Sequence, residues 1–180
     1  MGLNSDQRGV VRGSGLALAF SAGIIGAGYA WLPAELFGLE QAMTTADRIA
    51  FALKADLFLF VWLAGCVGAV SRGRFHSPAD VHGSAFGRPS PAIAVRLAVL
   101  QNSLEQTVLA LGAHLILATV LRGRELVLIP LLVLLFWVGR VAFAAGYPRG
   151  APGRAFGMAV TGAPIAASYL LAAGLMLSGR

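Results

Sequence analysis

The stretch PAIAVRLAVLQNSLEQTVLALGAHLILATVL, residues 91–121, decides the fold of this chain. It is apolar and longer than the roughly 20 helical residues that cross a bilayer core of about 30 Å. Several charged or strongly polar side chains nevertheless lie within it: Arg96, Gln101, Asn102, Glu105, Gln106 and His114. A charged group in the middle of such a helix costs about 2.5–3.5 kcal/mol on insertion scales. We therefore expect other helices to enclose this one, and its polar groups to line a site.

The polar residues of this helix fall on two faces, because each residue turns an ideal helix by about 100°. Asn102 and Glu105 share one face. Arg96, Ser103 and His114 lie on nearly the opposite face. One face could serve a ligand and the other a neighbouring helix. Alternatively, both faces form interhelical hydrogen bonds, which are worth about 0.6 kcal/mol per contact in membrane bundles.

The composition excludes a soluble domain. Of the 180 residues, 57% are hydrophobic and only 12% are charged, and the mean hydropathy is +0.75. Backbone groups in lipid need internal hydrogen bonds, and the apolar stretches lack the alternation of barrel strands. We therefore predict an all-α transmembrane helical bundle. Its five predicted spans are residues 14–37, 49–70, 93–121, 126–147 and 156–177.

The net charge of +6 follows from membrane topology rather than from nucleic-acid binding, because the basic residues end apolar runs. If the spans alternate in direction, nine basic residues fall on the side of the amino terminus: Arg8, Arg12, Arg72, Arg74, Arg88, Arg96, Arg140, Arg149 and Arg154. Five fall on the other side. The positive-inside rule then predicts a cytoplasmic amino terminus and a periplasmic carboxyl terminus. We expect a multi-pass protein of the bacterial inner membrane.

Other titratable residues lie near the ends of the spans. We expect Lys54 and Asp56 to reach from the second span to the interface, with a contact between Asp56 and another helix as the alternative. His76, Asp80 and His82 lie in the polar loop before the third span, but their spacing is not that of a metal site. The sequence therefore predicts no metal.

Arg140 of the fourth span is the predicted partner of Glu105. Residues 122–125 form a tight turn, so the third and fourth spans are an antiparallel hairpin. Arg140 lies about 10 Å from the end of its span, close to the depth of Glu105. Neither charge is stable alone in lipid, so we predict that the two pair across the hairpin. Pro148 predicts a break in the helix, after which Arg154 opens the last span.

These residues together resemble a known family. Asn102-Ser103-Leu104-Glu105 early in a long helix, then Arg140 through Gly146-Tyr147, then Arg154 seven residues later, is similar to the MAPEG pattern. MAPEG proteins are membrane-associated proteins of eicosanoid and glutathione metabolism. The resemblance covers the last four spans, in the order and with the loop lengths of the family.

The resemblance implies a homotrimer of helical bundles in the lipid bilayer, with glutathione bound between neighbouring subunits near the cytoplasmic side. Residues 1–44 then form an additional amino-terminal helix and outer loop, and residues 45–180 form the MAPEG-like four-helix domain. The implied activity is that of a glutathione-dependent transferase or peroxidase. Its substrates are lipophilic molecules that reach the site from the bilayer.

The family pattern also assigns roles to individual residues. By position, Asn102 and Glu105 match residues that contact the glutathione peptide, with Arg140 as a further cofactor-binding residue. Tyr147 matches a tyrosine of the third family helix, and Arg154 matches the arginine associated with thiol activation. The resemblance thus implies that Tyr147 and Arg154 are catalytic.

Three positions depart from the family members that use glutathione. Ala98 stands where those members commonly carry an arginine, Leu100 where they have Gln or His, and Phe143 where they have a tyrosine. Arg96 cannot replace the missing arginine, because two residues along a helix point it to almost the opposite face. A second function therefore stays open: a non-catalytic trimer with a degenerate glutathione site, which binds a lipid-like ligand or acts as a scaffold.

Overall fold

The computed structural model describes residues 2–39 and 41–180. Five long helices follow one another: α1 (Ser5–Trp31), α2 (Thr45–Phe75), α3 (Pro91–Val120), α4 (Leu128–Gly146) and α5 (Gly150–Leu177). Three short 3-10 helices connect them: η1 (Ala34–Phe37), η2 (Gly123–Val127) and η3 (Tyr147–Arg149). The described residues contain no strand. The prediction of an all-α bundle, with one helix added before four others, is confirmed.

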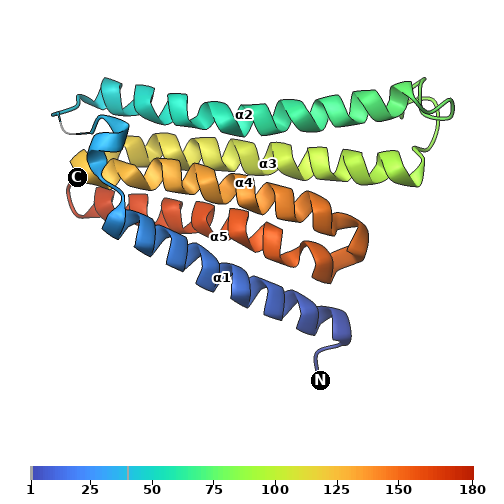
Figure 1. The fold of residues 1–180 in the computed structure, drawn as a ribbon, viewed down its shortest axis with the longest axis horizontal. Coiled ribbons are helices and arrows are strands. Elements are labelled where there is room, and N and C mark those ends of the chain that lie inside the picture. The colour runs from blue at the N-terminus through green and yellow to red at the C-terminus, as the bar shows by residue number, and fades with distance from the viewer. Residues whose placement is uncertain (1, 40) are drawn as a thin grey trace.

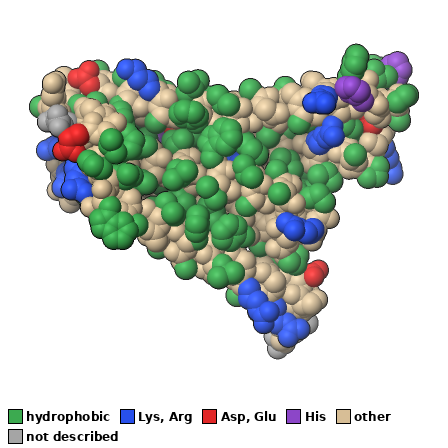
Figure 2. Space-filling view, viewed as in Figure 1, with side chains coloured by type: hydrophobic (Ala, Val, Ile, Leu, Met, Phe, Trp, Pro, Cys, Tyr) green, Lys and Arg blue, Asp and Glu red, His purple; other side chains and the backbone are tan. Residues whose placement is uncertain are grey.

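The helices have the length and apolarity of membrane spans. Within the described residues, four helical segments meet both criteria: Ser5–Trp31, Thr45–Phe75, Pro91–Val120 and Gly123–Leu177. The last segment contains both α4 and α5. Figure 2 shows hydrophobic side chains across the middle of one face, with Lys and Arg gathered toward the ends. This arrangement fits a multi-pass integral membrane protein.

Capping residues set the starts of the first two helices. The Asn4 side chain accepts a hydrogen bond from the Gln7 amide at 2.8 Å, and the Gln7 side chain accepts one from the Asn4 amide at 2.9 Å. Thr44 and Asp47 form the same reciprocal arrangement before α2. Because the Asn4 cap satisfies the first amides, α1 begins at Ser5 and not at residue 14 as predicted.

Neighbouring helices along the chain from α2 to α5 run in opposite directions (Figure 1). Helix α2 packs on α3, and α5 packs on α4, α1 and α3. The amino terminus, the 76–90 loop and η3 lie at one end of the bundle, which we call the N-side. The 32–44 connection, η2 and the carboxyl terminus lie at the other end, the C-side.

Helices α4 and α5 approach each other more closely than ordinary side chains allow. A Cβ atom on Gly157 would lie 2.6 Å from the Gly139 carbonyl oxygen, and one on Gly153 would lie 2.6 Å from the Gly146 carbonyl oxygen. We call Gly139, Gly146, Gly153 and Gly157 the glycine seam. Small residues allow two helix backbones to come together in this way, and the seam holds the two halves of the hairpin in place around η3.

Candidate functional site

Arg140 on α4 lies at the centre of the candidate site. Its side chain is completely buried, with 0% of its surface exposed. Its Nη1 donates a hydrogen bond to Asn102 Oδ1 on α3 at 2.7 Å, and its Nε donates to Thr161 Oγ1 on α5 at 3.1 Å. The guanidinium carbon lies 4.6 Å from the centre of the Phe143 ring. Arg140 therefore joins three helices with one side chain.

The predicted pair between Glu105 and Arg140 is wrong. Glu105 is exposed, and its carboxylate accepts hydrogen bonds from Gln101 Nε2 at 3.0 Å and from Asn102 Nδ2 at 3.5 Å. The residue level with Arg140 is Asn102, about one helical turn before Glu105. A neutral amide can accept from the buried guanidinium without a second charge being desolvated, so Glu105 is left at the surface of α3.

The break after α4 brings the predicted catalytic residues together. Tyr147 begins η3, and its ring meets that of Phe143 edge to face, with 5.4 Å between centroids. The chain then turns into α5, which places the Arg154 guanidinium carbon 4.6 Å from the centre of the Tyr147 ring. The prediction that the helix breaks near Pro148 is confirmed. The turn after the break still brings Arg154 against Tyr147, two residues that seven positions in a continuous helix would also have placed on one face.

All five predicted site residues therefore belong to one connected set on the N-side half of the bundle. Contacts run from Glu105 through Asn102, Arg140, Phe143 and Tyr147 to Arg154. We call these residues the polar array. Its middle is enclosed, whereas Glu105 is exposed and Arg154 is half-buried. Within the described part of the chain, Arg154 has no hydrogen-bond or ion-pair partner.

This geometry defines what the polar array can do chemically. Arg154 offers several N–H donors to an anion such as a carboxylate or a thiolate. Glu105 at the other end offers acceptors to an amine or an amide. The buried Arg140 donates to two protein oxygens, so it holds Asn102 and Thr161 in position.

The opposite face of α3 makes a different polar contact, which we call the buried pair. Asp56 Oδ1 on α2 lies 2.5 Å from His114 Nδ1, and the two side chains are 0% and 1% exposed. Asp56 Oδ2 has no partner within the described residues. The expectation that Asp56 reaches the interface is thus wrong, because Asp56 lies on the side of α2 that packs against α3. Its alternative, a contact with another helix, is correct.

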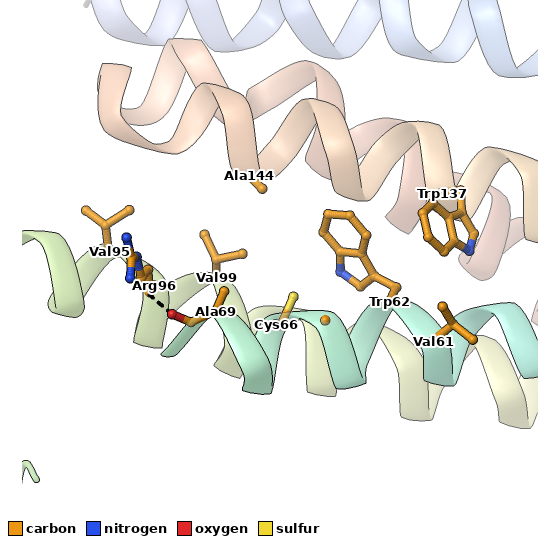
Figure 3. A pocket seen from close by; sticks show the side chains of 10 residues that line it. Val61, Trp62, Cys66, Ala69, Val95, Arg96, Val99, Trp137 and Ala144 are labelled. Atoms are coloured by element: carbon orange, nitrogen blue, oxygen red, sulfur yellow. Dashed lines mark hydrogen bonds between the residues drawn. The ribbon is translucent and has the colours of Figure 1, made fainter. Parts of the chain in front are cut away.

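A groove between α2, α3 and α4 was not foreseen from the sequence. It has a volume of about 520 Å³, and its walls include Trp62, Cys66, Val99, Trp137 and Ala144 (Figure 3). These residues are far apart in the chain and mostly apolar, so each alone looks like ordinary lipid-facing or core packing. The one polar signal in its wall was Arg96, which the sequence placed on the face of α3 away from Glu105.

Comparison with known proteins gives one match. The model of the MAPEG family matches residues 49–174. The matched segment contains the whole polar array and excludes α1. Among curated proteins, and among solved structures, no match was found.

Proposed function

The chain belongs to the MAPEG family, and on that premise we propose that it is a glutathione-dependent transferase or peroxidase that acts on lipophilic substrates. The observation that carries the proposal is the polar array. The residues that the family pattern assigns to glutathione lie in one connected set, although they come from α3, α4, η3 and α5. Its two ends are the parts that remain open to a ligand.

Each part of glutathione has a matching group in this proposal. The thiol gives its proton to water, and the free N–H donors of Arg154 stabilise the thiolate that remains. The Tyr147 ring beneath Arg154 holds the guanidinium, and its hydroxyl can donate a hydrogen bond toward sulfur. Glu105 and the amide nitrogen of Asn102 bind the peptide, with Arg140 as the positioning residue behind Asn102. In conjugation, the thiolate forms a carbon–sulfur bond with the electrophile, and the displaced electron pair leaves on its leaving group.

The proposal includes the assembly and its orientation. We propose a homotrimer, because Glu105 faces outward from the subunit and a neighbouring copy would complete the site around it. The excess of arginine on the N-side supports an orientation in which this end lies on the cytoplasmic face of a bacterial inner membrane, where soluble glutathione is available. Residues 45–180 would be the catalytic domain, and residues 1–44 the addition to it.

A different observation favours a second function, that of a non-catalytic trimer that binds a lipid-like ligand. Arg140 is enclosed, and its Nε and Nη1 donate to protein oxygens. Ala98 and Leu100 supply no further cation or donor on α3. Losing one charge-assisted contact to a carboxylate removes about 1.5–3 kcal/mol, which is tenfold or more in affinity.

A calorimetric titration of glutathione into the purified protein in nanodiscs separates the two functions. The transferase proposal predicts saturable binding at millimolar concentration or below. It also predicts that Arg154→Ala weakens binding at least tenfold, whereas Arg88→Ala, in the 76–90 loop, leaves it unchanged. Absence of saturable binding would reject the transferase proposal and favour the second function.

A further inference from the structure

The walls of the groove between α2, α3 and α4 are mostly apolar. The indole nitrogen of Trp62 donates to Ser103 Oγ at 3.0 Å, and that of Trp137 donates to the Phe58 carbonyl oxygen at 2.9 Å. Both polar atoms are thus satisfied by protein, and the two rings meet edge to face at 5.6 Å. What remains for an occupant of the groove is the carbon surface of both rings. A volume of about 520 Å³ lies in the range of ligand sites.

The N-side end of this groove is basic. Arg96 lies in its wall, and one guanidinium nitrogen donates to the Ala69 carbonyl oxygen at 3.1 Å, which leaves its other donors free of protein partners in the described residues (Figure 3). Arg96 also lines a second recess of about 320 Å³, together with Arg72 and His76 at the end of α2. The groove and the recess therefore meet at Arg96.

The positive charge of this recess is not neutralised nearby. Residues 71–96 contain four arginines and a single acid, Asp80. The Asp80 carboxylate already accepts hydrogen bonds from the Ser77 hydroxyl at 2.5 Å and from the Ser90 amide at 2.8 Å. Within the described chain, Arg72 and Arg96 form no ion pair. The recess thus presents the guanidinium group of Arg72 and the remaining donors of Arg96 at the end of an apolar groove.

We propose that the groove and the recess together bind one anionic phospholipid of the surrounding bilayer. Its phosphate binds Arg96 and Arg72, and one acyl chain lies along the groove toward Trp62 and Trp137. The order of polarity agrees with this occupant, because Arg96 lies toward one end of the groove and the two tryptophans lie farther along it (Figure 3). Arginine is well suited to phosphate oxygens. The site goes beyond the proposed glutathione chemistry, since it uses the face of α3 opposite Glu105.

Quenching of tryptophan fluorescence by brominated lipids tests this proposal directly, because bromine quenches only at contact. The third tryptophan, Trp31, is 82% exposed and would respond to any lipid, so the experiment uses Trp31→Phe as the parent. The parent is placed in nanodiscs of unbrominated phosphatidylcholine with increasing brominated phosphatidylglycerol or brominated phosphatidylcholine. We expect half-maximal quenching at about fivefold lower mole fraction of the anionic lipid.

Two kinds of variant distinguish binding of the lipid headgroup from binding of the acyl chain. Arg96→Gln and Arg72→Gln should each remove most of the preference for the anionic lipid, whereas Arg12→Gln, on α1, should preserve it. Gly65→Leu should reduce quenching by both lipids, since Gly65 lines the groove and a Cβ at this position has no neighbour within 4 Å. Equal quenching by the two lipids in the parent would overturn the proposal. So would an unchanged preference in both arginine variants, or an absence of quenching by either lipid.

Discussion

The two faces of α3 carry polar groups in two different arrangements. On the side of α2, the buried pair of Asp56 and His114 is shut away from every surface of the subunit. On the side of α4 and α5, the polar array has a buried middle but open ends at Glu105 and Arg154. The same helix thus holds one polar contact that serves folding and another whose ends can still meet a ligand.

The largest effect should come from breaking the buried pair. Asp56→Leu leaves His114 without its acceptor in a dry interface, and breaking such a pair costs about 3–5 kcal/mol in the free energy of unfolding. Unfolding in detergent, followed by circular dichroism, measures the loss. The double variant Asp56→Leu with His114→Leu should recover at least half of it, because no polar group is then left alone. Equal losses in the single and double variants would contradict a pairwise contact.

The next largest effect concerns the middle of the polar array. Arg140→Met removes the hydrogen bonds to Asn102 and Thr161 together, and we expect a loss of about 2–3 kcal/mol in the free energy of unfolding. Arg140→Lys keeps the charge but cannot reach both partners with a planar fork, so it should recover only part of the stability. The same unfolding measurement tests both variants. An unchanged free energy of unfolding in Arg140→Met would show that the polar array does not stabilise the packing of the helices.

The open end of the array should behave in the opposite way. Glu105→Gln changes an exposed side chain whose partners lie on its own helix, so the free energy of unfolding should stay within about 0.5 kcal/mol of the wild type. The affinity for glutathione should nevertheless fall about tenfold, measured by calorimetry. A large loss of stability with unchanged affinity would reverse the roles that we assign to the two parts.

The smallest effect concerns Asp80, which lies in the 76–90 loop outside the membrane spans. It belongs to neither the buried pair nor the polar array. Hydrogen bonds from the Ser77 hydroxyl and the Ser90 amide lower the pKa of the Asp80 carboxyl below its ordinary value. A lowered pKa in the folded state stabilises the fold above the ordinary pKa of about 3.9. This contribution is lost as the pH falls through the folded value. The difference in unfolding midpoint between wild type and Asp80→Asn should therefore shrink from pH 6 to pH 3.

The fold could be predicted from the sequence because backbone groups in lipid need internal hydrogen bonds, which leaves few structures other than helices. Length and apolarity place five helices along the chain. The start of α1 was missed because the Asn4 cap comes before a stretch that is only moderately apolar. Helix starts are set by a few hydrogen bonds, and hydropathy does not register them.

The resemblance named five residues that the structure connects, but it did not give their pairing. Phe143, which links Arg140 to Tyr147, was not among the five, and Arg140 was matched with Glu105 instead of Asn102. Depth estimated from the helix ends carries an error of about one turn, which is the distance between those two partners. His114 stood out as polar on the face of α3 opposite Glu105, yet no pattern in the sequence identified Asp56 as its partner. Such partners depend on how two helices are rotated against each other.

The glycine seam has a consequence for which changes this protein can tolerate. Backbone atoms of α4 and α5 occupy the space where side chains at Gly139 and Gly157 would stand, so no rearrangement of neighbouring side chains makes room for a larger residue. In a library of random variants selected only for accumulation in the membrane, the seam positions should stay glycine or nearly so. Glu105 and Arg154 should vary freely under that selection and become restricted only when survival depends on the bound ligand.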